Sequence, residues 1–136
     1  WAELEEMPRT LIHNDFNPRN IGFRRGDDGL TLCAYDWELA TIHIPQRDLA
    51  EFLAFSMRET VTKDEVDRYV ELHRTALEKA SKTTLDPEQW RRGYLYGLND
   101  FYINRMGLYL MGHTFRNYKF LERVVRVLRR LIEFEL

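Results

Sequence analysis

The stretch LIHNDFNPRNIGF, residues 11–23, is a short polar segment with apolar, strand-like residues on either side. It contains one His, one Asp and three Asn. A simple turn between two strands needs fewer hydrogen-bonding side chains than this. The segment is therefore the first candidate for a functional site.

The composition is that of an ordinary globular protein with a single domain. The chain has 136 residues, of which 44% are hydrophobic and 31% are charged. Its formal net charge of -2 gives no cationic field for nucleic acid or an anionic membrane, and no apolar run reaches the ~18 residues of a membrane span. The one cysteine, Cys33, allows no intrachain disulfide, which fits a reducing, cytoplasmic compartment. We therefore expect one domain over residues 1–136, without a nucleic-acid or membrane partner.

Hydrophobic periodicity divides the chain into a β-rich part, residues 1–45, and a helical part, residues 46–136. Runs of β-compatible residues lie at 10–12, 20–24 and 30–35, and a glycine-flanked turn at 25–29 suits a hairpin. Apolar spacing and capping residues predict helices that begin near Gln46, Thr62, Pro87 and Thr114. We therefore expect an α+β fold in which a small β-region carries the polar loop and about four helices follow.

The polar loop and the hairpin should bring three oxygen-bearing side chains together. Asp15 and Asn20 are five residues apart, and Pro18 between them favours a fixed loop. The hairpin that follows should return Asp36 close to Asn20. The three side chains then offer a candidate base and two hard oxygen ligands, which suit Mg²⁺ bound together with phosphates. This convergence predicts a metal–phosphate site.

The same residues resemble the motifs of a known family. His-x-Asp-x-x-x-x-Asn at residues 13–20, followed by Asp-Trp-Glu at 36–38, resembles the aminoglycoside phosphotransferase and choline kinase-like family, whose members are relatives of the protein kinases. Arg-Asp-Leu-Ala at 47–50 resembles a further segment of that family. The resemblance implies the C-terminal lobe of the protein kinase-like fold.

The resemblance also implies a role for each motif residue. Asp15 would be the catalytic base, and Asn20 and Asp36 would hold Mg²⁺ against the phosphates of ATP. His13 and Asp48 would support the catalytic loop, Asp48 by accepting hydrogen bonds from the loop backbone. The implied activity is the transfer of the γ-phosphoryl group of ATP to a hydroxyl of a small molecule.

Several polar residues are candidates for the pocket that binds this small-molecule acceptor. They are Glu38, Asn99, Asp100, Asn104 and Arg105. Glu38 could face a cationic acceptor, or it could be a solvated carboxylate or part of a salt bridge. For the four residues on the aromatic helix, the alternative is an ordinary role in helix packing. The identity of the acceptor stays open.

A working member of the family also needs a glycine-rich loop over the nucleotide, a Lys for the phosphates and a Glu that pairs with this Lys. In family order these groups precede the catalytic loop, and the twelve residues before His13 contain neither Lys nor Gly. We therefore expect the N-terminal lobe to be absent from this chain and the isolated chain to be nearly inactive. The N-terminal lobe of the same parent chain would be its partner. Without that lobe, the apolar surface that it would cover should favour self-association.

Two other functions stay open at this point. One is a kinase-fold module without catalysis, kept for binding or scaffolding. The other is a metal-dependent hydrolase centre that uses His13 and Asp15, although the remaining histidines, His43, His73 and His113, are scattered along the chain.

Overall fold

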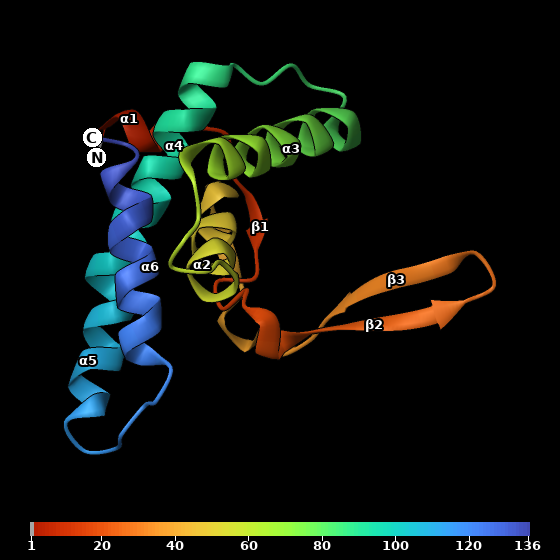
Figure 1. Cartoon of the computed structure of the whole chain (residues 1–136). Coiled ribbons are helices and arrows are strands. Elements are labelled where there is room, and N and C mark those ends of the chain that lie inside the picture. Colours follow the sequence, from red (N-terminus) through yellow and green to blue (C-terminus); the bar gives the residue numbers. More distant parts are fainter. Residues whose placement is uncertain (1) are drawn as a thin grey trace.

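The structure is a computed structural model that describes residues 2–136 of the chain. Short strands and turns come first, and helices follow (Figure 1). The first part consists of helix α1 (Ala2–Glu5), strand β1 (Thr10–Ile12), a 3₁₀ turn (Pro18–Asn20), strands β2 (Ile21–Gly26) and β3 (Gly29–Ala34), a second 3₁₀ turn (Trp37–Leu39) and strand β4 (Thr41–His43). The second part consists of helices α2 (Gln46–Ser56), α3 (Lys63–Ser81) and α4 (Pro87–Asp100), a π-helical segment (Phe101–Met106), and helices α5 (Gly107–His113) and α6 (Leu121–Glu133). The α+β class is confirmed, with five α-helices over residues 46–136 where about four are predicted.

The strands form two separate antiparallel pairs, with β1 before the polar loop in sequence and β2, β3 and β4 after it. β1 pairs with β4, and β2 pairs with β3 in a hairpin that projects from the helices in Figure 1. The hairpin extends to the Gly26–Gly29 pair, so its turn is tighter than the predicted one. Gly29 has a φ of 113°, a conformation that glycine adopts without steric cost.

The core lies among α2, α4 and α6, which pack on one another. Leu53, Leu98 and Leu128 are fully or almost fully buried in it. Gly97 on α4 allows close contact with α2, because a Cβ at this position would lie 2.9 Å from the backbone oxygen of Gln46. The start of α2 is thereby held against α4, and this start carries residues of the site described below.

The helix starts follow the capping signals where such signals exist. Thr62 and Glu65 form a reciprocal capping box at the start of α3, and the Asp86 carboxylate accepts the N–H of Gln89 at 2.7 Å at the start of α4. The prediction that the last helix begins near Thr114 is wrong. The Thr114 hydroxyl donates back to the carbonyl of Met111 at 2.7 Å at the end of α5, and α6 begins only at Leu121.

The helices between residues 2 and 136 are too short or too polar to span a lipid bilayer. Apolar side chains are nevertheless exposed on both strand pairs. They include Leu11 and Ile42 on the β1–β4 pair, and Phe23, Leu30 and Leu32 on the hairpin.

Candidate active site

The carboxylate of Asp48, in the first turn of α2, holds the polar loop by its backbone. Its Oδ2 accepts the N–H of His13 at 2.7 Å, and its Oδ1 accepts the N–H of Asn14 at 2.8 Å. Burial raises the pKa of the Asp48 carboxyl, although the two backbone hydrogen bonds act in the opposite direction. Asn14 has a φ of 60°, a left-handed conformation that Asn tolerates better than most residues. The loop therefore turns sharply at Asn14, directly before Asp15.

The side chain of His13 connects the loop to the end of the hairpin. Its Nε2–H donates to the backbone carbonyl of Tyr35 at 2.8 Å, and its ring packs against Trp37 with a centroid separation of 4.7 Å. The imidazole is almost completely buried. His13 therefore supports the loop through its Nε2 hydrogen bond and its packing on Trp37, while its Nδ1 is buried and has no hydrogen-bond partner within residues 2–136.

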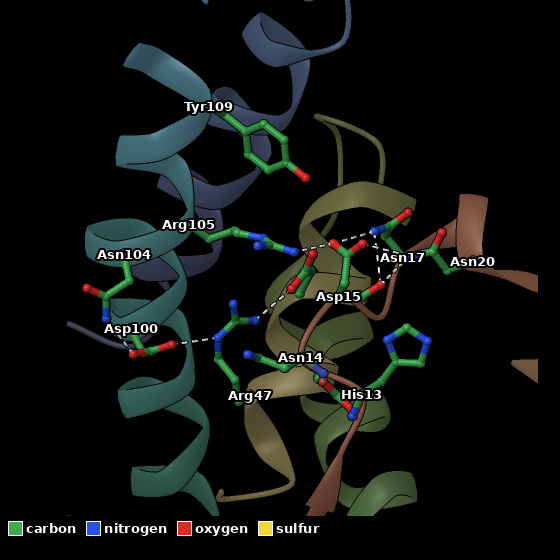
Figure 2. A network of polar contacts seen from close by, with 12 residues as sticks. His13, Asn14, Asp15, Asn17, Asn20, Arg47, Asp100, Asn104, Arg105 and Tyr109 are labelled. Atoms are coloured by element: carbon green, nitrogen blue, oxygen red, sulfur yellow. Dashed lines mark hydrogen bonds and ion pairs between the residues drawn. The ribbon is translucent and has the colours of Figure 1, made fainter. Parts of the chain in front are cut away.

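The carboxylate of Asp15 is held from three directions (Figure 2). Asn20 Nδ2 donates to its Oδ2 at 2.7 Å, and Arg105 Nη2 donates to its Oδ1 at 2.6 Å. Asn17 Nδ2 makes a longer contact with Oδ1, at 3.2 Å. The Asp15 side chain keeps 18% of its surface exposed. It is thus fixed in orientation and still reachable from solvent, as a general base must be.

Asn20 and Asp36 lie next to each other at the base of the hairpin. The N–H of Tyr35 donates to the carbonyl of Asn20 at 3.0 Å, and Asp36 follows Tyr35 directly. Asp36 is exposed and has a φ of 65°, an uncommon conformation for a residue other than glycine. Its carboxylate has no hydrogen bond or ion pair with any residue in 2–136. The chain at Asp36 is thereby brought back beside Asn20, whereas no hydrogen bond joins the two side chains within the described residues.

The donor set of this site fits Mg²⁺ in chemical type. Asn20 donates its amide hydrogens to the carboxylate and to the backbone carbonyl of Asp15. Its amide oxygen receives no hydrogen bond within residues 2–136. This oxygen and the carboxylate of Asp36 are therefore available as hard ligands. Mg²⁺ commonly uses one or two protein carboxylates together with phosphate oxygens and water.

A hydrolase metal centre would need a cluster of histidine and carboxylate side chains. Across the described residues, no three His, Cys, Asp or Glu side chains come close enough together to hold a metal ion. The hydrolase alternative, which needs such a cluster around His13 and Asp15, therefore receives no support from the structure.

Comparison with known families decides the relationship. The model of the phosphotransferase enzyme family matches residues 1–95. The chain belongs to the phosphotransferase enzyme family. The match includes the polar loop, the hairpin and Asp48, so it confirms the resemblance stated from the motifs. Searches of curated proteins and of solved structures gave no match.

An ion-pair network behind the loop of this phosphotransferase-family chain was not predicted. Arg47 Nη1 donates to Glu51 at 2.8 Å, and Arg47 Nε donates to Asp100 at 2.6 Å, which links α2 to α4. The side chains of Arg47 and Glu51 are only 3% and 0% exposed. Burial raises the pKa of the Glu51 carboxyl, although the Arg47 guanidinium beside it acts in the opposite direction. The spacing of Arg47 and Glu51 on one helix face is the sequence signal that could have identified this pair.

The π-helical segment Phe101–Met106 brings Arg105 to the loop. Arg105 comes from 90 residues further along the chain than its partner Asp15. Burial lowers the pKa of Arg105, but the ion pair with Asp15 and the nearby Glu51 outweigh this effect and raise it. Single π-helical turns within α-helices are frequently found at functional sites. No residue pattern predicts this segment from the sequence alone.

The predicted pocket residues do not all lie together. Asp100, Asn104 and Arg105 lie together near the loop, and Asn104 Nδ2 donates to Asp100 at 2.7 Å (Figure 2). Asn99 lines a hollow beside Tyr96, and the lining of this hollow also includes Asp100 and Asn104. Glu38 lies exposed in the second 3₁₀ turn, and within residues 2–136 its carboxylate pairs with no cation.

We predict that Arg47→Met lowers the free energy of unfolding by about 3–5 kcal/mol, because the Glu51 carboxylate then stays buried without its cation. Urea denaturation at neutral pH measures the change. Arg129→Met is the matched control: Arg129 also pairs with a Glu four residues later, but 82% of its side chain is exposed. This control should cost less than about 1 kcal/mol. Equal losses for the two variants would contradict the network's structural role.

Proposed function

We propose that this chain carries the catalytic loop of a Mg²⁺- and ATP-dependent phosphotransferase, which moves the γ-phosphoryl group of ATP to a hydroxyl of a small molecule. Family membership supports phosphotransfer in general. The observation that supports the specific proposal is the Asp15 carboxylate, which is held between Asn20 and Arg105 in a loop fixed by Asp48.

The proposed roles follow from the contacts of each side chain. Asp15 would orient the acceptor hydroxyl and take its proton, because its carboxylate is fixed and partly exposed. The amide oxygen of Asn20 and the carboxylate of Asp36 would hold the metal ion, since neither is used by the protein within residues 2–136. Bound Mg²⁺ would neutralise charge on the phosphates. Arg105 would keep Asp15 in place from the opposite side of the loop.

We also propose that the described fold is the C-terminal lobe of a kinase-like enzyme, whose N-terminal lobe completes the nucleotide site. The exposed apolar residues of the two strand pairs support a partner that covers them. In solution without such a partner, these residues would favour self-association. The single cysteine fits a cytoplasmic location.

Binding of Mn²⁺, a paramagnetic substitute for Mg²⁺, tests the metal site in the chain itself. We predict that low concentrations of Mn²⁺ broaden the backbone amide signals of Asn20, Tyr35 and Asp36 before others in the NMR spectrum. Asp36→Asn should weaken this effect about tenfold or more, because loss of even an outer partner of a metal site costs that much. Asp28→Asn, at an exposed carboxylate in the hairpin turn, is the control and should change nothing.

Broadening that begins elsewhere, or that survives Asp36→Asn unchanged, would contradict the metal site. In that case a kinase-fold module without catalysis would become the better account of the chain.

We further predict that the isolated chain turns over ATP no faster than its Asp15→Ala variant. Phosphoryl transfer depends on positioning and charge neutralisation, and the groups expected to bind the triphosphate are not found in the twelve residues before His13. A coupled assay with Mg²⁺ and ATP measures the rate. Clear Asp15-dependent turnover would overturn the proposal that a separate lobe is required, while it would support phosphotransfer.

A further inference from the structure

Tyr35 lies between β3 and the second 3₁₀ turn, and three different groups of this residue bond to the polar loop. Its N–H donates to the carbonyl of Asn20 at 3.0 Å, and its hydroxyl donates to the carbonyl of Arg19 at 2.5 Å. Its own carbonyl accepts the Nε2–H of His13 at 2.8 Å. Every polar group of Tyr35 is therefore bonded to the polar loop.

Two of these contacts hold Asn20 from both sides. The carbonyl of Arg19 belongs to the peptide unit before Asn20, and the carbonyl of Asn20 belongs to the peptide unit after it. The N–H of Asn20 is in turn bonded to the carbonyl of Asn17 at 2.9 Å. Because both peptide units are held, the backbone from which the buried Asn20 side chain extends is fixed relative to Tyr35.

Asp36 follows Tyr35 directly and has a backbone that needs support. Its φ of 65° and ψ of 54° place it in the left-handed region, which is uncommon for residues other than glycine. Such conformations persist where the surrounding structure holds them, and they cluster at active sites. On the other side of Asp36, the indole N–H of Trp37 donates to the carbonyl of Ala34 at 3.0 Å. The chain is thus held both before and after Asp36.

The hydroxyl is the part of this arrangement that depends on the tyrosine side chain. Any residue other than proline offers the backbone N–H and carbonyl that are used here, whereas the bond to Arg19 needs the phenol. Tyr35 is 51% exposed, so its ring contributes less to the core than a buried tyrosine would. The specific contribution of Tyr35 is therefore its hydrogen bond to the turn that carries Asn20.

We propose that Tyr35 is a positioning residue for the metal site, whose hydroxyl sets the place of Asn20 relative to Asp36. The inference rests on the proposed function, in that Asn20 and Asp36 are taken as the ligands of Mg²⁺. Mg²⁺ demands near-ideal octahedral geometry, so two ligands from different segments bind it together only where their separation is fixed. Tyr35 supplies this constraint by holding the turn, and it does not itself bind the metal.

Tyr35→Phe removes the hydroxyl and leaves both backbone hydrogen bonds possible. In the chain without metal, the amide of residue 35 should exchange with solvent about fivefold faster, the factor that corresponds to the loss of one hydrogen bond of ordinary strength. Amides in α4 and α6 should keep their protection. Tyr96→Phe is the matched control and should leave residue 35 unchanged, since the exposed hydrogen bond of the Tyr96 hydroxyl goes to Glu3, outside the polar loop, at 2.6 Å.

Mn²⁺ separates positioning of the ligands from general support of the fold. In the wild-type chain, Mn²⁺ should broaden the amide signals of Asn20 and Asp36 together. In Tyr35→Phe, the affinity for Mn²⁺ should fall about fivefold. The broadening at Asn20 should also decrease relative to that at Asp36, because the ion stays with the exposed carboxylate and loses its fixed distance to the turn. Lower occupancy alone reduces both signals equally and leaves this ratio unchanged.

The proposal is overturned if the amide of residue 35 exchanges at the wild-type rate in Tyr35→Phe, or if the ratio of the broadening at Asn20 to that at Asp36 stays the same. Normal Mn²⁺ binding by the wild-type chain with an unchanged variant would remove only the role of Tyr35 and leave the proposed function standing. A wild-type chain without Mn²⁺ broadening is a different result, which would remove the metal site and the role of Tyr35 with it.

Discussion

Two hydrogen bonds from the backbone of the polar loop to the carboxylate of Asp48 fix the loop on which the rest of the site is built. Asp48 belongs to α2, and α2 is packed into the core against α4 and α6. The loop therefore takes its orientation from the most buried part of the molecule. Because the bonds come from His13 and Asn14, the next side chain along, that of Asp15, is directed toward Arg105 and Asn20.

Ion pairs link the loop and α2 to the helices that follow. Asp15 pairs with Arg105 from the π-helical segment, while Arg47 pairs with Glu51 in its own helix and with Asp100 at the end of α4. Each of these groups loses solvation on burial, and the opposite charge compensates for the loss. Removing one of these groups would leave its partner's charge partly buried without an opposite charge. The loop and the helices behind it therefore depend on one another.

The elements that depend on nearby residues could be predicted from the sequence. The strand at 10–12 and the hairpin follow from β-compatible runs, α2 from its apolar spacing, and the starts of α3 and α4 from their capping residues. The contact of Asp15 with Asn20 needs only a fixed loop between them. Strand β4 was not predicted, because it is defined by its pairing with β1 from a distant part of the sequence. Helix α6 lacks a capping side chain that would mark its start. The π-helical segment and the pair of Asp15 with Arg105 could not be predicted, because they depend on how distant parts of the chain pack. The left-handed backbone at Asp36 is likewise invisible in the sequence.

Hydrogen exchange at the amides of His13 and Asn14 tests the role of Asp48 most directly. In Asp48→Asn, the side chain keeps its shape, but its NH₂ group must face one of two N–H donors. The account predicts that both amides exchange at least about tenfold faster, since a lost hydrogen bond to a charged group is worth roughly 1.5–3 kcal/mol, while amides in α4 and α6 keep their protection. Asp86→Asn is the control, because an N-cap needs only one acceptor oxygen and Asn caps about as well as Asp. Unchanged protection of His13 and Asn14 in Asp48→Asn would contradict the account.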